Sequence, residues 1–378
     1  MKAIIMAGGM GTRLRPVTGE LPKPMAPLCG RPIMEHIVYR LRDSGFEDIC
    51  AALKYRAEDI MAYFGDGSRF GVKMQYRVET DALGTAGGVK NCADFYGEED
   101  FLVISGDAAC DFELEKLMQE HRRQAAAATI ALYREPSPLR YGLALSDASG
   151  RIMSFIEKPD WPRVVTDRVN TGIYLLSPRA MELVPQGRSY DFGKELFPEL
   201  LRRGEKIAGL EMQGYWCDIG TPLAYYKCCA DAIEGRLKIR LGQGFLASPS
   251  GRGAEQSEAE RETGEACPAQ KKGRRPLSQP SGLPAPPEGE PRAEEVPCED
   301  RAGLMARLSA ELMELGADYS DGIRLRGGRM SLHIFPSAAA SALKVTVQSE
   351  DAEFARDMLE LAKKAVEEAA KEGRAGGH

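Results

Sequence analysis

Residues 3–16 read Ala3-Ile4-Ile5-Met6-Ala7-Gly8-Gly9-Met10-Gly11-Thr12-Arg13-Leu14-Arg15-Pro16. The short apolar run is typical of a buried strand, and it passes directly into a glycine-rich loop that carries Arg13. Ligands bind at the carboxyl edge of parallel strands, where glycines let backbone N–H groups approach phosphate and a guanidinium grips two phosphate oxygens. The loop lacks the Gly-Lys-Ser/Thr ending of a Walker A loop, and Leu14 stands where a dinucleotide fingerprint has its third glycine. The stretch therefore predicts a strand followed by a phosphate-binding loop of another kind.

Outward from this strand, short apolar runs alternate with stretches whose apolar residues recur at helical spacing. The strand-like runs are 49–53, 101–104, 129–132 and 173–176, and the helical stretches include 33–41 and 114–121. Continuous apolar runs of this length are typical of strands that are buried on both faces. The alternation therefore predicts β-α-β units around a largely parallel sheet, which is the α/β fold class.

Length and composition exclude several classes of protein. The chain has 378 residues, 43% of them hydrophobic, with a net charge of −6. This charge gives no general attraction to polyanions, so we expect no nucleic-acid partner. No apolar run approaches the ~18 residues of a membrane helix and no signal peptide is recognisable, so we expect a cytoplasmic protein without a membrane partner. Nine cysteines without Cys-x-x-Cys spacing fit reduced thiols better than a disulfide framework or a zinc site.

The composition changes twice along the chain and predicts two domains joined by a linker. Residues 246–300 hold 9 of the 23 prolines and no aromatic residue, so they are expected to be a disordered Pro- and Glu-rich linker between domains at 1–245 and 301–378. The last 78 residues show two helical patterns, near 304–315 and 351–371, around strand-like runs at 322–326, 329–334 and 343–347. These residues predict a small α+β domain. The linker has too little apolar surface to hold this domain rigidly against the larger one.

Six motifs, taken in order, carry a resemblance to a known family. They are Gly9-Met10-Gly11-Thr12-Arg13-Leu14 with Pro22-Lys23-Pro24; Leu83-Gly84-Thr85-Ala86-Gly87; Ser105-Gly106-Asp107; Tyr141-Gly142 with Glu157-Lys158-Pro159; Val169-Asn170-Thr171-Gly172; and Trp216-Cys217-Asp218-Ile219-Gly220-Thr221-Pro222. Over about residues 1–235 the chain resembles the sugar-1-phosphate nucleotidylyltransferases. The resemblance implies a Rossmann-like mixed, mainly parallel sheet, the nucleotide-diphospho-sugar transferase fold.

The resemblance also implies a role for each motif. Nucleotide binding is expected of Ala7, Gly8, Gly9, Gly11, Thr12, Gly84, Thr85 and Ala86, and catalysis of Arg13, Lys23 and Lys158. Sugar-phosphate binding is expected of Gly142, Glu157, Lys158, Asn170 and Thr171. Asp107 and Asp218 would hold Mg²⁺, which prefers carboxylate and phosphate oxygens. In this reaction a sugar 1-phosphate oxygen attacks the α-phosphorus of a nucleoside triphosphate, so positive charge is the main requirement and no general base is needed.

The substrates are less sharply indicated than the reaction. Residues 190–198, Tyr-Asp-Phe-Gly-Lys-Glu-Leu-Phe-Pro, resemble the mannose branch of the family, which favours GTP and mannose 1-phosphate as substrates. The alternatives are a glucose-1-phosphate thymidylyl-, uridylyl- or adenylyltransferase, and a non-catalytic regulatory subunit that binds nucleotide sugars. Glu157-Lys158-Pro159 and Trp216–Pro222 argue against a cytidylyltransferase or molybdopterin-type guanylyltransferase on the same fold. Whether the chain forms a homo-oligomer stays open.

The C-terminal residues carry a weaker resemblance, to the last domain of the phosphohexomutases. It rests on Asp321-Gly322-Ile323-Arg324-Leu325 and the strand-like runs that follow. That family places a loop of the form Arg-Pro-Ser-Gly-Thr-Glu-Pro after such strands, whereas this chain has Phe335-Pro336-Ser337-Ala338-Ala339-Ala340-Ser341. The chain also has no Ser-His-Asn-Pro-like phosphoserine loop. We therefore expect a degenerate domain without mutase activity.

Overall fold

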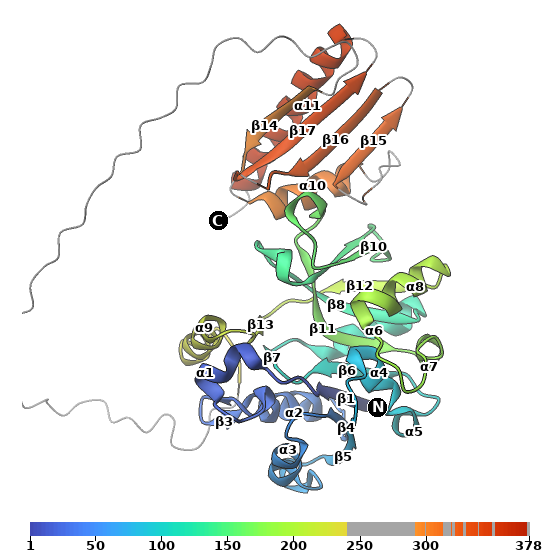
Figure 1. Ribbon diagram of the computed structural model, residues 1–378, viewed down its shortest axis with the longest axis vertical. Coiled ribbons are helices and arrows are strands. Elements are labelled where there is room, and N and C mark those ends of the chain that lie inside the picture. The colour runs from blue at the N-terminus through green and yellow to red at the C-terminus, as the bar shows by residue number, and fades with distance from the viewer. Residues whose placement is uncertain are drawn as a thin grey trace, which may run out of the picture.

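A computed structural model of the chain describes residues 1–239, 292–298, 300–312, 319, 322–327, 330–338, 340–349 and 352–375. The predicted linker, residues 246–300, lies outside the described residues up to position 291. Figure 1 shows two units, a larger one formed by residues 1–239 and a smaller one formed by the C-terminal residues. The helices of the described residues include none that is long and apolar enough to cross a membrane.

A nine-stranded mixed sheet forms the centre of the larger unit. Its main path runs β10-β9-β11-β6-β1-β4-β5, while β8 pairs with β11 and β12 pairs with β8. The strands are β1 (Lys2–Ala7), β4 (Asp48–Leu53), β5 (Lys73–Val78), β6 (Phe101–Ser105), β8 (Ala128–Arg134), β9 (Gly142–Ser146), β10 (Ile152–Glu157), β11 (Arg168–Leu176) and β12 (Ile207–Glu211). β1 is parallel to β4 and β6, and β11 is antiparallel to β6 and β8. The predicted α/β class and mixed sheet are confirmed.

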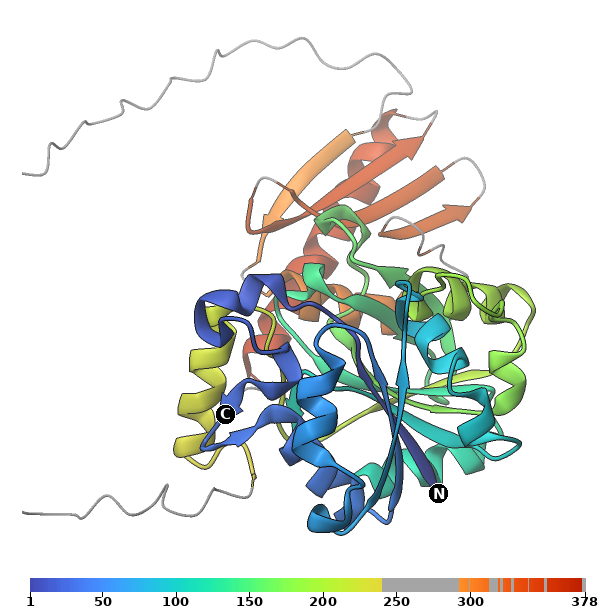
Figure 2. The ribbon, with the colours of Figure 1, turned by 60° about the horizontal axis from the view of Figure 1, so that its bottom comes forward.

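Helices and two short ribbons surround this sheet, as Figures 1 and 2 show. The helices are α1 (Arg15–Thr18), α2 (Ile33–Asp43), α3 (Ala57–Phe64), α4 (Gly84–Lys90), α5 (Ala93–Tyr96), α6 (Leu114–Gln124), α7 (Pro178–Met181), α8 (Phe197–Arg202) and α9 (Pro222–Ile233). The ribbons pair β2 (Pro27–Leu28) with β3 (Arg31–Pro32) and β7 (Ala108–Cys110) with β13 (Trp216–Asp218). The β7-β13 ribbon matters for function because it brings Asp218 opposite Ala108, next to Asp107.

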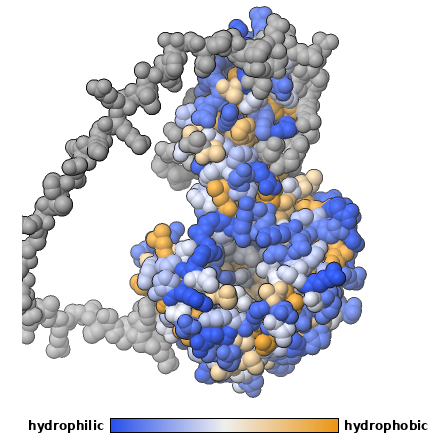
Figure 3. Space-filling model, viewed as in Figure 1, coloured by the Kyte–Doolittle hydropathy of each residue, from blue (hydrophilic) through white to orange (hydrophobic). Residues whose placement is uncertain are grey.

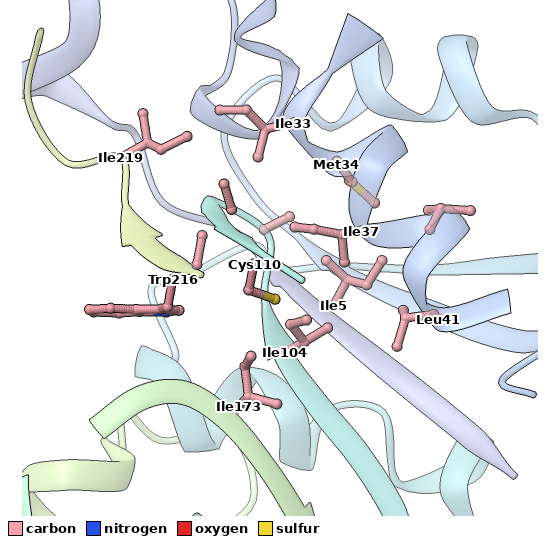
Figure 4. Close-up of a cluster of buried hydrophobic side chains, with 14 of the residues drawn as sticks. Ile5, Ile33, Met34, Ile37, Leu41, Ile104, Cys110, Ile173, Trp216 and Ile219 are labelled. Atoms are coloured by element: carbon pink, nitrogen blue, oxygen red, sulfur yellow. The ribbon is translucent and has the colours of Figure 1, made fainter. Parts of the chain in front are cut away.

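The core lies on both faces of the sheet because successive residues of a strand point to opposite faces. Ile4 and Ile5 of β1 are both fully buried, yet they belong to different clusters. Ile5 packs with Ile37 and Leu41 of α2, as the close-up in Figure 4 shows. Ile4 packs on the other face, in the cluster that contains Val89 of α4. This two-sided burial explains the continuous apolar run at the start of the chain.

The smaller unit is a four-stranded antiparallel sheet with two helices. The strand order is β14-β17-β16-β15, and the elements are β14 (Arg292–Pro297), α10 (Arg301–Leu312), β15 (Ile323–Gly327), β16 (Met330–Pro336), β17 (Ala342–Ser349) and α11 (Ala352–Ala375). The end of the predicted linker is therefore wrong, because residues 292–297 form a strand paired with β17. Val296 is buried and supplies an apolar group to this unit, although proline and glutamate dominate the composition around it.

The two units pack directly on each other. Leu145 of β9, Ile156 of β10 and Val165 are buried in one cluster with residues of the smaller unit such as Leu304 and Leu308 of α10. In Figure 1, α10 lies between its own sheet and the end of the larger unit at which β10 is found. This differs from the expectation of a loosely held small domain, because the contact is made by α10 and not by the linker.

Candidate active site

The loop after β1 is shaped by a glycine that makes room for Lys23. Gly11 has a φ of +57°, a backbone conformation that residues with side chains rarely adopt. A Cβ atom at position 11 would lie 2.6 Å from Cβ of Lys23. Pro22 and Pro24 flank the lysine, and its side chain is 10% exposed. The glycine-rich loop and the proline-flanked lysine, predicted separately, therefore form one packed unit.

Lys23 lies between the two predicted metal-binding carboxylates. Its Nζ is 2.5 Å from Oδ2 of Asp107 and 3.2 Å from Oδ1 of Asp218. Asp107 follows the end of β6, where it also accepts a hydrogen bond from Ser105 Oγ at 2.5 Å. Burial alone would raise the pKa of Asp107, but the charge and hydrogen bond of Lys23 outweigh burial and lower it. Burial likewise lowers the pKa of Lys23, and the two carboxylates more than reverse this effect.

The two carboxylates fit a hard divalent cation. Asp107 and Asp218 converge on one positively charged atom, and both offer oxygen, which is the donor that Mg²⁺ prefers. Among the described residues, no group of three or more His, Cys, Asp or Glu side chains is placed to hold a metal. A cation at this point would therefore need further oxygens from phosphate groups or water, as Mg²⁺ commonly takes them.

Three cavities meet at Asp107, on a face of the larger unit that Figure 3 shows to be hollowed. The glycine-loop cavity, ≈ 270 Å³, is lined by Met6, Ala7, Gly9, Gly11, Thr12, Arg13, Lys23, Pro24, Asp107 and Gly220. The Glu79 cavity, ≈ 350 Å³, is lined by Met6, Gly8, Gly9, Ala52, Lys54, Glu79, Ala82, Gly84, Thr85, Gly88, Ser105, Asp107 and Asp191. The Trp216 cavity, ≈ 160 Å³, is lined by Ser105, Asp107, Ala108, Arg140, Tyr141, Gly142, Glu157, Asn170, Thr171, Gly172, Trp216 and Asp218. Groups bound in these cavities would be adjacent at Asp107.

The glycine-loop cavity also holds the predicted arginine. Arg13 is exposed, and a Cβ atom at Gly220 would come within 3.3 Å of its Nη2 and 3.0 Å of Oδ2 of Asp218. The glycine at position 220 therefore allows the segment after β13 to pass close to both side chains. Arg13 and Lys23 bring two cationic groups to one small cavity that Gly9 and Gly11 of the loop also line.

The Glu79 cavity contains three charged residues that were not among the predicted site residues: Lys54, Glu79 and Asp191, the last from the 190–198 motif. Glu79 follows the end of β5, and its Oε2 accepts the backbone N–H of Leu83 at 3.2 Å. Burial raises the pKa of Glu79, although the Leu83 hydrogen bond and the charge of Lys54 act against this. The available signal was positional, since β5 is parallel to β4 and ends at the same edge of the sheet as the glycine loop.

The Trp216 cavity brings together four of the five predicted sugar-phosphate residues. Gly142 and Glu157 are cross-strand partners in β9 and β10, and a Cβ atom at position 142 would lie 2.7 Å from Oε2 of Glu157. Asn170 donates from Nδ2 to the hydroxyl of Tyr174 at 2.9 Å, while Thr171 donates to the carbonyl of Ala131 at 2.7 Å. The cavity also includes Arg140, Tyr141 and Trp216, so it has an arginine that was not among the predicted site residues.

Two predicted site residues lie outside the walls of the three cavities. Lys158 has a φ of +46° and a side chain that is 61% exposed, with Nζ 3.5 Å from Oε1 of Glu157. The structure therefore places it beside the Trp216 cavity. Ala86 is fully buried, and its N–H donates to the carbonyl of Tyr190 at 2.9 Å. Its expected part in nucleotide binding is not supported by this geometry, because α4 begins at Gly84 and turns Ala86 into the core.

Another cavity, ≈ 600 Å³, lies apart from these three. It is lined by residues 146–150, by Leu132, Arg168, Gly209 and Glu211, and by Ala310 of the smaller unit. None of the predicted site residues lines it, and two of its charged residues, Arg168 and Glu211, pair with each other at 3.1 Å.

Comparisons with known proteins show the family to which the larger unit is similar. The nucleotidyl transferase family matches residues 2–235. A UTP–glucose-1-phosphate uridylyltransferase of Synechocystis sp. is 37% identical over 251 residues, which are 63% of this chain and 65% of that protein. A mannose-1-phosphate guanylyltransferase of Mycobacterium tuberculosis is 36% identical over 234 residues, covering 62% of this chain and 65% of that protein. The match thus spans slightly less than two thirds of the length of each of these two relatives.

The larger unit is also similar to a solved structure. HddC from Yersinia pseudotuberculosis, complexed with GMP-PN, is 28% identical in sequence with a TM-score of 0.53. The similarity covers 61% of this chain and 99% of that chain. Nearly all of that chain therefore corresponds to one part of this chain.

Proposed function

The chain belongs to the nucleotidyl transferase family, and on this premise we propose that it transfers a nucleotidyl group from a nucleoside triphosphate to a hexose 1-phosphate. The observation that carries the proposal is the meeting of three cavities at Asp107, beside Lys23 and Asp218. Such an arrangement holds two phosphate-bearing molecules with their reacting groups at one point, which is the main contribution that an enzyme makes to this reaction.

The triphosphate would lie in the glycine-loop cavity. There Gly9, Gly11 and Thr12 offer backbone close to the phosphates, and Arg13 and Lys23 supply positive charge. The base and ribose would occupy the adjoining Glu79 cavity, between Gly8 and the segment Gly84–Thr85. The two cavities share Met6, Gly9 and Asp107, so one nucleotide can extend through both.

The sugar 1-phosphate would lie in the Trp216 cavity. Glu157 and Asn170 offer polar groups for sugar hydroxyls, and Gly142 leaves the room that a side chain would fill. Arg140 and, from beside the cavity, Lys158 would attract the phosphate. This phosphate then faces Asp107 and Asp218, which also line the Trp216 cavity.

The chemical step is a displacement at the α-phosphorus. An oxygen of the sugar 1-phosphate forms the new bond, and the bond from the α-phosphorus to the bridging oxygen breaks, so pyrophosphate leaves with the electron pair. Arg13 and Lys23 stabilise the negative charge that develops on the phosphates. Asp107 and Asp218 would hold Mg²⁺, which when bound would neutralise phosphate charge at the point of transfer. No residue has to remove a proton from the attacking phosphate.

We propose GTP as the nucleotide, and Glu79 supports this choice. A carboxylate accepts hydrogen bonds, and the edge of guanine presents two adjacent donors, N1–H and N2–H₂. Uracil and thymine present one N–H between two carbonyl oxygens, which a carboxylate repels. Because Glu79 lines the cavity beside Gly84 and Thr85, its carboxylate favours guanine over a pyrimidine there.

We propose mannose 1-phosphate as the sugar substrate and GDP-mannose as the product, a choice that the relative from Mycobacterium tuberculosis supports by its name and the relative from Synechocystis does not. The test is an assay of pyrophosphate release by the full chain across a grid of nucleoside triphosphates and hexose 1-phosphates. We expect GTP with mannose 1-phosphate to give the highest kcat/KM. A higher kcat/KM for UTP with glucose 1-phosphate would contradict the proposed substrate pair. If no pair releases pyrophosphate, the proposed reaction is overturned.

We propose the domain division that was expected from the sequence, with one change. The transferase domain comprises residues 1–245, and the smaller domain, expected at residues 301–378, begins at residue 292 because β14 belongs to its sheet. The resemblance of the smaller domain to phosphohexomutases stays a prediction.

A further inference from the structure

The connection between β10 and β11, residues 158–167, joins two walls of the Trp216 cavity. It begins directly after Glu157, the last residue of β10, and it leads into β11, which carries Asn170 and Thr171. Glu157, Asn170 and Thr171 all line that cavity. A shift of the connection would therefore move cavity residues at both of its ends.

The connection is buried from two sides. Val164 is fully buried in the cluster that contains Ile5 and much of the core of the larger unit, to which α10 contributes Ala302. Val165, the next residue, is 1% exposed and belongs instead to the cluster that contains Leu304 and Leu308 of α10. Consecutive side chains of extended backbone point in opposite directions, so the two faces of the connection are buried in different clusters, and α10 contributes to both.

Two polar side chains of α10 hold the same connection. Ser309 is fully buried, and its hydroxyl donates to the carbonyl of Val165 at 2.7 Å. The guanidinium of Arg301 lies over the ring of Trp161, 3.7 Å from its centroid. Trp161 is only four positions after Glu157, in a short 3-10 helix, Trp161–Arg163, within the connection.

Arg301 is itself fixed by the smaller domain. Its Nη1 donates to the carbonyl of Ser337 at 2.7 Å and to that of Ala340 at 2.9 Å. These two carbonyls belong to the turn between β16 and β17. Because Arg301 is held by that turn, its position over Trp161 is set before any ligand binds.

We propose that the smaller domain positions the hexose 1-phosphate subsite of the transferase, with Arg301 and Ser309 as positioning residues that act through the 158–167 connection. The inference rests on the proposed function for the identity of that ligand. Neither residue lines the Trp216 cavity. The glycine-loop and Glu79 cavities are built from other segments, so the effect falls on the sugar phosphate and spares the nucleotide.

The test is steady-state kinetics of the full chain with Arg301→Ala and Ser309→Ala, varying each substrate in turn. We expect the KM for the hexose 1-phosphate to rise about five-fold in each variant, the loss expected for one hydrogen bond at Ser309 and for one cation–π contact at Arg301, with the KM for the nucleoside triphosphate unchanged. Ser309→Thr keeps the hydroxyl and should restore much of the loss. Arg356→Ala, at an exposed arginine on α11 of the same domain, is the matched control and should change neither KM.

Other outcomes would overturn the inference. A lower melting temperature with both KM values unchanged would show that α10 only attaches the domain, and an equal rise in both KM values would show a general distortion. Equilibrium binding of mannose 1-phosphate and glucose 1-phosphate, by calorimetry, separates this inference from the proposed function. If the unaltered chain shows no turnover but the variants bind these sugar phosphates more weakly than it does, the proposed reaction is overturned and positioning is supported. If the variants and the unaltered chain bind them equally, positioning is overturned.

Discussion

Nζ of Lys23 lies 2.5 Å from Oδ2 of Asp107, although the two residues are 84 positions apart in the chain. Asp218 joins them from a third segment, at 3.2 Å from the same Nζ. The site thus keeps a cationic group at the point where its two carboxylates converge. The lysine holds these negative charges together without a metal, and it does so at the place where the substrates' phosphates would add more negative charge.

Replacing either carboxylate by its amide should abolish most activity and leave the fold intact. Asp107→Asn and Asp218→Asn each remove one proposed metal ligand without changing core volume, so we expect kcat to fall about 100-fold or more. The measurement is kcat over a titration of MgCl₂, with circular dichroism to verify the fold. Activity close to that of the unaltered chain at limiting Mg²⁺ would refute the two-carboxylate assignment.

Removing the lysine should make the stability of the protein depend on divalent cations. Lys23→Met leaves Asp107 and Asp218 without their shared cation, so we expect a lower melting temperature than in the unaltered chain. Excess MgCl₂ should raise the melting temperature more in this variant than in the unaltered chain. Lys158→Met, at a lysine with a 61% exposed side chain, is the control and should show no such difference. An equal response to MgCl₂ in all three proteins would contradict cation binding by the aspartates.

Exchanging Glu79 for glutamine should change which base is used. A glutamine amide can both donate and accept, so Glu79→Gln suits the alternating edge of uracil better than a carboxylate does. We expect kcat/KM for GTP to fall about tenfold and the ratio of UTP to GTP use to rise. Both quantities follow from the pyrophosphate-release assay, and an unchanged ratio of UTP to GTP use would mean that Glu79 does not contact the base.

Binding of the sugar phosphate should weaken as the medium becomes acidic. Burial raises the pKa of Glu157, and nearby Asp191 adds to this, while Lys158 and Lys194 act against it. A carboxyl group with a raised pKa takes up its proton at a higher pH than an ordinary glutamate, so as the pH falls it loses its charge earlier and then accepts weaker hydrogen bonds from sugar hydroxyls.

The corresponding measurement is the pH profile of the KM for the hexose 1-phosphate. Glu157→Gln should have a higher KM at neutral pH and a flatter profile, because only the titration of the sugar phosphate itself then remains. Identical slopes for the variant and the unaltered chain would exclude Glu157 as the titrating group.

Two glycines of the first loop should respond differently to alanine. Gly11→Ala places a Cβ atom 2.6 Å from Lys23 at a φ of +57°, so it should cost about 1–2 kcal/mol of stability as well as activity. A Cβ atom at Gly9 would meet nothing within 4 Å of the protein, so Gly9→Ala should keep the melting temperature. It should still lower activity, because Gly9 lines the proposed phosphate cavity. Denaturant unfolding together with kcat/KM distinguishes the two effects, and similar stability losses would contradict this account.

The features that were predictable from sequence are those encoded by neighbouring residues. The uninterrupted apolar run that contains Ile4 and Ile5 predicts a strand buried on both faces, and both residues are buried. The glycine loop follows in the same stretch. Asp107 and Asp218 came from a motif resemblance, because the ribbon that brings Asp218 opposite Ala108 has no sequence signal of its own. Glu79 was missed since a single glutamate after a strand is unremarkable until the sheet order places it beside the glycine loop.

The contact between the two domains was not predictable in the same way. Leu145, Ile156 and Val165 lie in short strands and a connection where apolar residues are expected in any case. Nothing in these residues tells whether their partners come from the same domain or from a helix far along the chain. The start of β14 was hidden for a related reason, since one strand is too short to change the composition of a Pro- and Glu-rich segment.

The burial of Val165 against α10 has a consequence for how the protein is made. During synthesis the ribosome releases Leu145, Ile156 and Val165 long before it reaches Leu304 and Leu308, at ≈ 5–20 residues per second. For roughly ten seconds the newly folded transferase domain therefore exposes an apolar patch next to its Trp216 cavity. In this interval the nascent chain is open to aggregation and to binding by chaperones, and it loses that vulnerability once α10 emerges and covers the patch.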